Sequence, residues 1–451
     1  MLRRPAQSAL RRVDTLRRQL LRQPAAASSS GAGVGPTGAA LATDVPAVAA
    51  TAAAAAAVGT AQHSSNMADK GIVAEGEACP FLQASTGDLL EYSVVYTDRA
   101  INLMSVPFQE CMREISSILK EAYKGTATAI IPGSGTYAME AVARQFGTGK
   151  KCMVIRNGFF SFRWSDIFEC CSIPSEEIVL KARVQNFSKT NPPMAPVPVE
   201  EVVGNILESK PDVVFAPHVE TATGILLPDS YLKQVADAVH QVGGIFVLDA
   251  IAAGTLWANM EDLGVDVLVT APQKGWSGPA CCGIVVMNDK AKEITKNTKS
   301  TSFSCNLGKW LEVMEKYEAG GFMYYTTLPT DALMAFRKTM LETRDLGFET
   351  ASENARALGQ SVRNTMAKYN LGSVAAPGFE APTVVVCYSE SAEMVANFKA
   401  QGLQIAGGVP FKCDEPEGLK TFRIGLFGID KLRNPERTAN IFAEKLGEIM
   451  K

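Results

Sequence analysis

The chain has 451 residues, 47% of them hydrophobic, and a formal net charge of −3. This is enough material for one large or two ordinary domains with a substantial core. Seven arginines lie within residues 1–23, so the body of the chain is net acidic, which argues against non-specific nucleic-acid binding. Ten cysteines without a Cys-x-x-Cys pair argue against a metal site or a disulfide framework and favour a reducing compartment.

The first 66 residues differ in composition from the rest. Arginines alternate with leucines over residues 1–23, and residues 24–66 are nearly all Ala, Ser, Gly, Thr and Val. An Arg-rich, Ser/Ala-rich and acid-poor leader is typical of an organelle transit peptide, and a disordered tail without an address is the alternative. We therefore expect the mitochondrial matrix, with a plastid as the second choice, and no membrane anchor, because the leader is too weakly apolar to span a bilayer.

Strands, loops and helices alternate between residues 107 and 287. Helical spacing of apolar residues predicts the helices, and short apolar runs predict the strands. This alternation predicts an α/β fold with a mostly parallel, doubly wound sheet. The expected strands are 126–132, 151–155, 212–216, 244–248, 266–270 and 282–287, and the expected helices are 107–123, 137–146 and 230–242.

The pattern changes after residue 330. One long helical stretch, 331–369, precedes strands over 383–388 and 420–426 and helices over 391–401 and 434–450. This predicts a smaller C-terminal α/β domain. The predicted division is a leader over 1–66, a large domain over 67–330 and a small domain over 331–451.

A lone acid and a lone lysine follow two of the predicted strands. Asp249 ends strand 244–248, and Lys274 comes just after strand 266–270. In a parallel sheet both would emerge at the carboxyl ends of neighbouring strands, where open α/β sheets bind ligands. An acid and an amine there suggest a site for pyridoxal phosphate (PLP), with the acid on the pyridinium nitrogen and the lysine in a Schiff base. Such pairs also occur in inert α/β proteins.

Several other stretches suit a cofactor but have ordinary explanations. Gly133–Thr136, at a strand-to-helix turn, could bind a phosphate or could simply cap the helix. The aromatic stretch 157–164 could stack on a flat ring, or pack in the core or at a dimer contact. Hydroxyls in 218–224 could donate to a ligand oxygen, whereas three histidines in all make a His-centred mechanism hard to build. Arg423 suits a carboxylate or a partly buried ion pair, and the Tyr-rich loop 320–329 could reach a neighbouring subunit.

Taken together and in order, these stretches resemble the class V aminotransferases, which are fold-type I PLP enzymes, and within them the alanine–glyoxylate / serine–pyruvate aminotransferase group. The resemblance runs from about residue 95 to the end. Its most specific parts are Gly133–Thr136 with Met139-Glu140-Ala141, His218–Gly224, Asp249, Gln273-Lys274 and Arg423–Leu426.

The resemblance implies a role for each site residue. Lys274 is the Schiff-base lysine and proton shuttle, and Asp249 is the pyridinium partner. Phe160 and Ile251 cover the two faces of the ring, and Thr221 bonds its oxygen. The phosphate is held by Ser134, Gly135, Thr136 and Gln273, together with Tyr324 and Thr327 of the other subunit of a homodimer. The substrate carboxylate is held by Arg423.

The sequence departs from the family pattern where the substrate is chosen. Residues 102–107 replace a Gly-Pro-rich opening loop, Ala271-Pro272 precede Gln273, and Phe160 replaces a frequent Trp. Because no second cationic pocket is visible, small or neutral amino acids such as alanine or serine are expected as donors, with glyoxylate or pyruvate as the acceptor. Two alternatives stay open: a lyase of the cysteine desulfurase type, for which Cys413 is the candidate nucleophile, and a binding protein that keeps the fold without chemistry.

Overall fold

The structure is a computed structural model that describes residues 91–97, 100–185, 191–389, 391 and 393–451. The expected leader, residues 1–66, and with it the transit peptide, lies outside the described residues. Within the described part of the chain, no helix combines the length and the apolar character that a bilayer-spanning segment needs.

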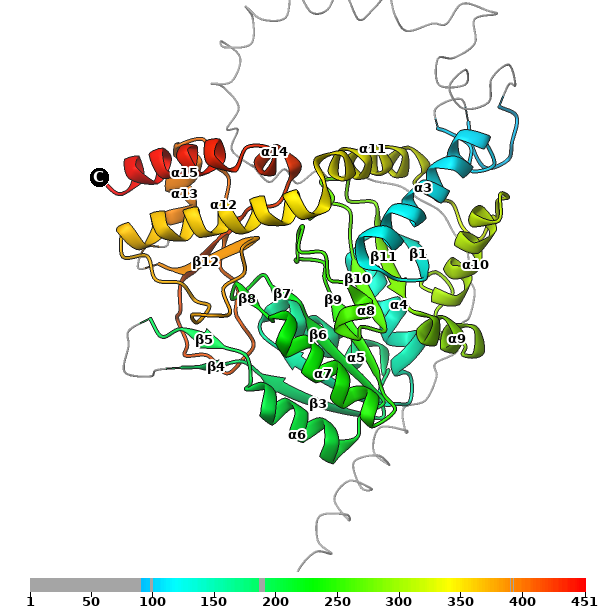
Figure 1. The fold of residues 1–451 in the computed structure, drawn as a ribbon, viewed down its shortest axis with the longest axis horizontal. Helices are drawn as coiled ribbons and strands as arrows, with labels where there is room; N and C mark the ends of the chain where they lie inside the picture. Colours follow the sequence, from blue (N-terminus) through cyan, green and yellow to red (C-terminus); the bar gives the residue numbers. More distant parts are fainter. Residues whose placement is uncertain (1–90, 98–99, 186–190, 390, 392) are drawn as a thin grey trace, which may run out of the picture. The chain divides into compact units, whose positions relative to one another are not determined.

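A seven-stranded sheet forms the centre of the fold, in the order β1-β11-β10-β9-β6-β2-β3. Strand β11 runs antiparallel to both of its neighbours, and the pairs from β10 to β3 are parallel. The expected α/β fold with a mostly parallel sheet is thus confirmed (Figure 1). The strands are β1 (Ala127–Pro132), β2 (Lys151–Arg156), β3 (Glu176–Lys181), β6 (Val213–Pro217), β9 (Ile245–Asp249), β10 (Val267–Thr270) and β11 (Cys282–Met287).

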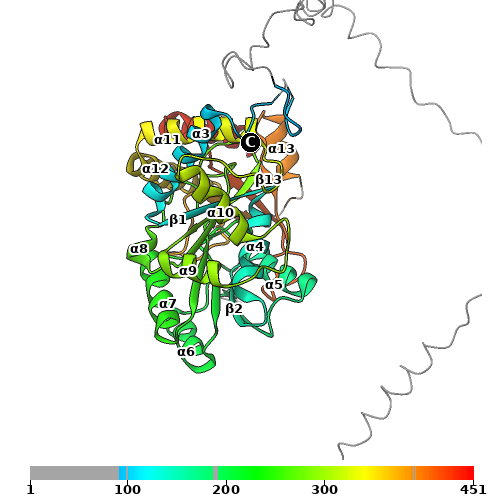
Figure 2. The same cartoon turned by 90° about the vertical axis from the view of Figure 1, so that its right-hand side faces the viewer.

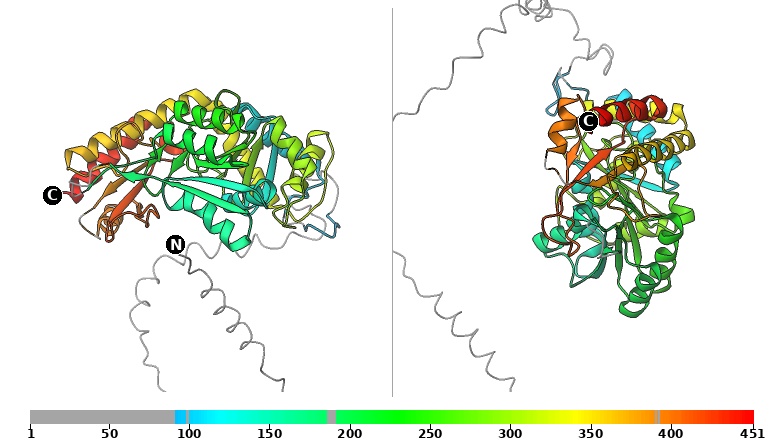
Figure 3. Two further views of the ribbon diagram at one scale, coloured as in Figure 1. Left: turned by 90° about the horizontal axis from the view of Figure 1, so that it is seen from below. Right: turned by 90° about the vertical axis from the view of Figure 1, so that its left-hand side faces the viewer.

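Helices cover both faces of this sheet, which explains why its inner strands are almost continuous apolar runs. Figure 2 shows α6, α7 and α8 on one side of the strands and α4 and α5 on the other, and the left panel of Figure 3 shows the same layers from below. Further helices pack around β1 and α3. The bounds are α3 (Val106–Tyr123), α4 (Gly135–Gly147), α5 (Phe159–Cys171), α6 (Val199–Ser209), α7 (Asp229–Gln241), α8 (Met260–Leu263), α9 (Asp289–Asn297) and α10 (Leu307–Glu318).

Two short ribbons decorate the ends of the main strands. One pairs β4 (Arg183–Val184) with β5 (Met194–Ala195), and the other pairs β7 (Val219–Glu220) with β8 (Ile225–Leu226). The second ribbon directly follows β6 and therefore places residues 221–224 at the carboxyl edge of the sheet.

The long helical stretch expected over 331–369 is two helices, α11 (Thr330–Leu346) and α12 (Phe348–Lys368). Gly347 separates them with φ +92°, a conformation that an ordinary helical residue avoids. Beyond α12 lies a three-stranded antiparallel sheet in the order β12-β14-β13. Figure 1 shows α12 and α15 running side by side over this part of the chain. The bounds are β12 (Val384–Tyr388), β13 (Ala406–Gly407), β14 (Thr421–Gly425), α13 (Met394–Ala400), α14 (Ile429–Leu432) and α15 (Pro435–Ile449).

Strand β12 joins two apolar cores. Val384, Val386 and Tyr388 belong to the core of the main sheet, whereas Val385 and Cys387 belong to a second core with α12, α13 and α15. Successive side chains of a strand point to opposite faces, so one strand serves both cores. The domain boundary at residue 330 stays a prediction, since this strand is shared between the two parts.

Candidate active site

A cavity of about 580 Å³ opens where the carboxyl ends of the parallel strands face the three-stranded sheet. Its lining comes from α4, α5, β9 and the segment after β10 on one side, and from β12, β13 and β14 on the other. Every site residue predicted from the sequence lines this cavity except Tyr324 and Thr327. The predicted residues that line it are Ser134, Gly135, Thr136, Phe160, Thr221, Asp249, Ile251, Gln273, Lys274 and Arg423.

Asp249 is the acid of the cavity. It ends β9 between Pro217 of β6 and Val269 of β10, and only 7% of it is exposed. Burial raises the pKa of its carboxyl to about 7. The backbone N–H of Ile251 donates to Oδ1 at 3.0 Å, which lowers this pKa and partly opposes the effect of burial. A buried carboxyl of this kind is well suited to share a proton with a ring nitrogen, because pairing with a cation favours its charged form.

Lys274 reaches the same cavity from the turn after β10. Burial lowers the pKa of its amine, and the charge of Arg423 lowers it further. Its Nζ lies 5.2 Å from the centre of the Phe427 ring. The chain needs glycine at the next position, because a Cβ on Gly275 would lie 2.0 Å from the carbonyl oxygen of Gly254. The backbone next to Lys274 therefore packs closely against the backbone of Gly254.

The glycine turn before α4 presents neutral hydrogen-bond donors to the cavity. Ser134 is the N-cap of this 13-residue helix, and its side chain makes no capping bond, so its hydroxyl is not committed to the helix. A Cβ on Gly135 would lie 2.7 Å from Cδ1 of Ile251, which shows how closely the backbone approaches that residue. The first N–H groups of a helix lack intrahelical partners and favour an anion.

Two threonines of the 218–224 turn have separate roles. The Thr223 hydroxyl donates to the backbone oxygen of Asn157 at 2.8 Å and is buried. Thr221 lines the cavity instead. The hydroxyl available to a ligand is therefore that of Thr221, as predicted. His218 lies behind them, fully buried, with its pKa lowered to about 4 by burial, and is neutral near pH 7.

Phe160 is held on helix α5, which the sequence did not predict as a helix. The helix begins at Phe159, and the buried carboxylate of Glu220 accepts the backbone N–H groups of Phe160 and Ser161 at 3.2 and 2.8 Å. An acid at a helix N-terminus satisfies its free donors and its dipole. A residue sixty positions away in the chain thus holds the start of the helix that carries the aromatic ring.

Arg423 enters from the other side of the cavity. Phe422 and Ile424 of β14 are buried in the second core, so strand alternation turns Arg423 away from that core, as predicted. Its Nε donates to the backbone oxygen of Gly407 at 2.8 Å, and its guanidinium carbon lies 5.6 Å from the centre of the Phe160 ring. The remaining N–H groups of its fork can bind a carboxylate.

Arg163 is a second guanidinium in this cavity, and sequence reasoning missed it. Arg163 lines the cavity together with Lys274 and Arg423, while the absence of a second cationic pocket for a substrate side chain stays a prediction. Its Nη1 donates to Oγ1 of Thr136 at 3.1 Å. The sequence holds no local signal for this contact, because helix α5, which carries residue 163, was itself not predicted.

Tyr324 and Thr327 lie away from their own chain's cavity. Tyr324 is 53% exposed, in the loop between α10 and α11. This position is compatible with the predicted contact to the phosphate of another subunit, which stays a prediction.

The residues of the cavity fit PLP. The side-chain amide of Gln273 has a buried oxygen with no partner among the described residues, and the Ser134 hydroxyl makes no capping bond. The NH2 group of Gln273 and the hydroxyl of Ser134 are the neutral donors that a phosphate could use. These donors line the same cavity as the buried acid Asp249, the side chains of Phe160 and Ile251, and the Lys274 amine, whose pKa is lowered by burial. The cavity thus contains groups suited to each part of PLP: donors for the phosphate, an acid and apolar side chains for the ring, and an amine for the aldehyde.

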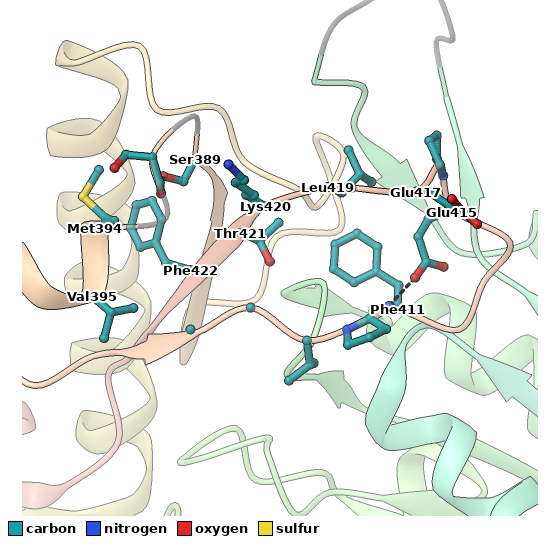
Figure 4. Close-up of a pocket in the computed structure, with 17 residues that line it drawn as sticks. Ser389, Met394, Val395, Phe411, Glu415, Glu417, Leu419, Lys420, Thr421 and Phe422 are labelled. Carbon is teal, nitrogen blue, oxygen red and sulfur yellow. Dashed lines mark hydrogen bonds between the residues drawn. The ribbon is translucent and has the colours of Figure 1, made fainter.

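A second cavity, of about 510 Å³, lies beside β14 and the loop after β13 (Figure 4). Glu415 lines this cavity, and its carboxylate accepts hydrogen bonds from the backbone N–H groups of Phe411 and Cys413 at 2.6 and 2.9 Å. These bonds hold the loop after β13 in place. None of the predicted site residues lines this cavity.

The fold and the site define a PLP enzyme of fold type I. The model of the family described as aminotransferase class-V matches residues 180–408, so the chain belongs to the class-V aminotransferases, which depend on PLP. The resemblance stated from the motifs is confirmed.

Curated relatives and solved structures agree with this assignment. The alanine–glyoxylate aminotransferase 1 of Saccharomyces cerevisiae is 25% identical over 71% of this chain and 83% of the relative. The serine–glyoxylate aminotransferase of Hyphomicrobium methylovorum is 31% identical over 53% of this chain and 56% of the relative. The crystal structure of alanine–glyoxylate aminotransferase from Nostoc sp. has a TM-score of 0.66 at 18% identity, covering 78% of this chain and 89% of that one.

Proposed function

We propose that this aminotransferase moves the amino group of a small amino acid, of the alanine or serine type, to a 2-oxo acid such as glyoxylate or pyruvate. The observation that carries the proposal is one cavity in which the amine of Lys274, the buried acid Asp249 and the guanidinium of Arg423 converge. The names of the curated relatives support glyoxylate as the acceptor.

Each of these side chains has a defined task. Arg423 binds the carboxylate of the amino acid and orients its Cα. The lowered pKa of Lys274 favours a neutral Nζ, which can accept the α-proton and give it back. Asp249 holds a proton on the ring nitrogen of the cofactor, and Thr221 donates to the ring oxygen. When bound, PLP supplies the electron sink that makes removal of the α-proton feasible.

An absorption spectrum tests the cofactor site directly. The purified protein should show a band at roughly 410–430 nm that disappears in Lys274→Ala and on borohydride treatment. Lys412→Ala is the matched control, because Lys412 lies over the Phe162 ring and does not line this cavity. A protein that stays colourless after incubation with PLP would contradict the proposal and favour the non-catalytic alternative. A panel of amino donors against glyoxylate, pyruvate and 2-oxoglutarate then assigns the substrates.

The structure offers little support for the lyase alternative. The thiol of Cys413 is buried, donates toward the backbone oxygens of Arg156 and Phe411, and does not line the cavity. Burial raises its pKa to about 12. A desulfurase needs a reactive, accessible thiolate, whereas this thiol is protonated and enclosed. Release of sulfide from cysteine that is lost in Cys413→Ala would reverse this conclusion.

We also propose a homodimer in which each copy supplies Tyr324 and Thr327 to the other's phosphate site. Phe303 and Phe322, near the same loop, are 71% and 46% exposed. Exposed aromatic side chains of this kind support a contact with another protein surface there. Mixing Lys274→Ala chains with Tyr324→Phe/Thr327→Ala chains tests the sharing. Hybrid dimers would contain one intact site, so about a quarter of the wild-type activity should return after random reassociation. No recovery would show that the sites are not shared.

We propose, finally, that residues 1–66 direct the chain to the mitochondrial matrix. The support is the sequence of the leader, with its seven arginines among leucines. A fluorescent protein carrying residues 1–75 should enter mitochondria, and a variant with the arginines replaced by glutamine should not. Accumulation of the unchanged fusion in plastids or in the cytosol would contradict the assignment.

A further inference from the structure

The phosphate end of the proposed site has neutral walls and one neighbouring cation. Ser134, Gly135, Thr136 and Gln273 offer hydroxyl, amide and backbone donors but no charge. The cationic side chains that line the cavity are Arg163, Lys274 and Arg423. Of these three, only Arg163 has a hydrogen bond to a residue of the phosphate end, to Thr136. A phosphate dianion in a partly buried site needs positive charge nearby.

Arg163 is held firmly where it meets Thr136. It lies in the first two turns of α5, whose first N–H groups are fixed by the buried carboxylate of Glu220. Its guanidinium carbon lies 5.3 Å from the centre of the Phe160 ring, an arrangement in which cation and ring attract each other. A rigid helix and an aromatic platform therefore set the direction of its fork.

The hydrogen bond between Arg163 and Thr136 has only one possible polarity. A guanidinium donates and cannot accept, so Oγ1 of Thr136 is the acceptor of the 3.1 Å bond. The hydroxyl proton of Thr136 is then free to be donated elsewhere. Thr136 is the second residue of α4 and lines the cavity, so its proton can point to a ligand beside the free N–H groups of the helix.

We propose that Arg163 is a positioning residue for the cofactor phosphate: it turns the Thr136 hydroxyl into a donor toward the phosphate and supplies the positive charge of that end of the cavity. This rests on the proposed PLP site. Arg163 is also close enough to Asp249 to lower the pKa of that carboxyl, which agrees with its lying within the cavity's electrostatic reach.

A comparison of two ligands separates a phosphate role from a ring role. Cofactor-free protein is titrated with PLP and with pyridoxal, which lacks the phosphate, and both dissociation constants are measured by absorbance or by quenching of protein fluorescence. Arg163→Gln should weaken PLP binding about 10- to 100-fold, the range for a charge-assisted hydrogen bond, while changing pyridoxal binding less than about threefold. Arg163→Lys should fall between the two, because it keeps the charge and loses the fork.

Arg423→Gln is the matched control. It removes a guanidinium that also lies over the Phe160 ring but has no bond to Thr136. It should leave the dissociation constant of PLP within about threefold of wild type. An equal loss in both variants would show that only the overall charge of the cavity matters and would overturn the role of Arg163.

A double-mutant cycle tests whether Arg163 acts through Thr136. Thr136→Val should itself weaken PLP binding by about tenfold, and Arg163→Gln added to it should cost much less than it does alone. Additive losses would overturn the coupling. If Arg163→Gln does not fold, as judged by circular dichroism of the cofactor-free protein, Thr136→Val and Arg163→Lys still carry the test.

The remaining outcomes are distinct. Equal weakening of PLP and pyridoxal would assign Arg163 to the packing of Phe160. Unchanged PLP binding with a raised KM for aspartate or 2-oxoglutarate alone would assign it to a second substrate carboxylate. Both would overturn the proposal and leave the PLP site intact, whereas wild-type protein that binds neither ligand would overturn the proposed function itself.

Discussion

Asp249 and Lys274 follow strands β9 and β10 of a seven-stranded sheet, and both strands are buried along their whole length. Arg423 lies on β14 of a three-stranded sheet, in which buried residues alternate with partly exposed or exposed ones. The residues meant for the cofactor are held by a large core and by backbone contacts. The residue meant for the substrate is held by a thin sheet and one bond to Gly407. We therefore expect the part of the cavity that contains Asp249 and Lys274, the cofactor half, to be more rigid than the part that contains Arg423, the substrate half.

The largest effect should come from Asp249→Asn, which removes the acid from the rigid half. Transamination should fall by at least about a thousandfold, because a neutral amide cannot keep the ring nitrogen protonated. Initial rates with a saturating amino donor measure this. A loss smaller than tenfold would show that Asp249 does not face the ring nitrogen.

The same variant should be more stable than wild type when both are free of cofactor. The Asp249 carboxyl has a pKa of about 7 in the fold, raised mainly by burial and also by Glu220, against 3.8 for an ordinary aspartate. The folded protein therefore holds a proton that the unfolded chain releases, and its stability falls as pH rises from about 4 to 7. Urea unfolding should show Asp249→Asn ahead by about 2–4 kcal/mol at pH 8 and by much less at pH 5. A gap that widens toward low pH would contradict this.

Arg423→Gln should affect the thinly supported half alone. We expect the KM for the amino acid to rise about a hundredfold, since one bidentate carboxylate contact is lost, while the absorption band of the bound cofactor persists. Steady-state kinetics and spectra measure the two properties separately. Arg437→Gln is the control, because Arg437 is exposed on α15 and does not line the cavity. Loss of the absorption band in Arg423→Gln would show that the two halves are not separable.

Phe422→Ala should weaken the support of Arg423, although Phe422 itself does not line the cavity that contains Arg423 and Asp249. Phe422 is 1% exposed in the second core, where its ring lies 6.1 Å from that of Phe398. Truncating a buried Phe costs about 3–5 kcal/mol, so chemical denaturation should detect the change easily. Met450→Ala, at an exposed position, should stay within about 0.5 kcal/mol of wild type. Equal stability of both variants would show that the second core contributes little.

The smallest effect should come from Gly135→Ala. The added Cβ would approach Cδ1 of Ile251 to 2.7 Å, and because that atom ends a flexible side chain, the structure can yield. We expect PLP binding to weaken about three- to tenfold with little change in unfolding free energy. Gly204→Ala, which meets no atom within 4 Å in α6, should instead stabilise the fold by about 0.5–1 kcal/mol. Unchanged PLP binding in Gly135→Ala would show that the turn has more room than its contacts indicate.

The sequence was a good guide wherever signals were local. Six strands of the main sheet were predictable because both of their faces are buried and each is an apolar run. The edge strand β3 begins with two exposed glutamates, is only half-buried over the rest of its length, and was not predicted. Asp249 and Lys274 stood out as single charged residues after such runs. Arg423 was placed correctly because alternation along β14 leaves it on the face opposite Phe422 and Ile424.

What the sequence did not reveal depends on distant contacts. Helix α5 begins at two phenylalanines without a nearby acid, and the carboxylate that satisfies its N-terminus is Glu220, far away in the chain. The bond from Arg163 to Thr136 joins two helices and has no sequence pattern. The break between α11 and α12 depends on the backbone of Gly347, which the helical periodicity on both sides concealed.

Strand β12 sets how the two parts of the molecule respond to heat. Its neighbouring residues Val385 and Val386 are both fully buried but belong to different cores. Neither core can melt without exposing one side of a strand that the other core still needs, so we expect a single cooperative thermal transition. A substitution in the C-terminal part should therefore lower the melting temperature of the whole described chain, and the half that holds the cofactor should lose its colour in that same transition.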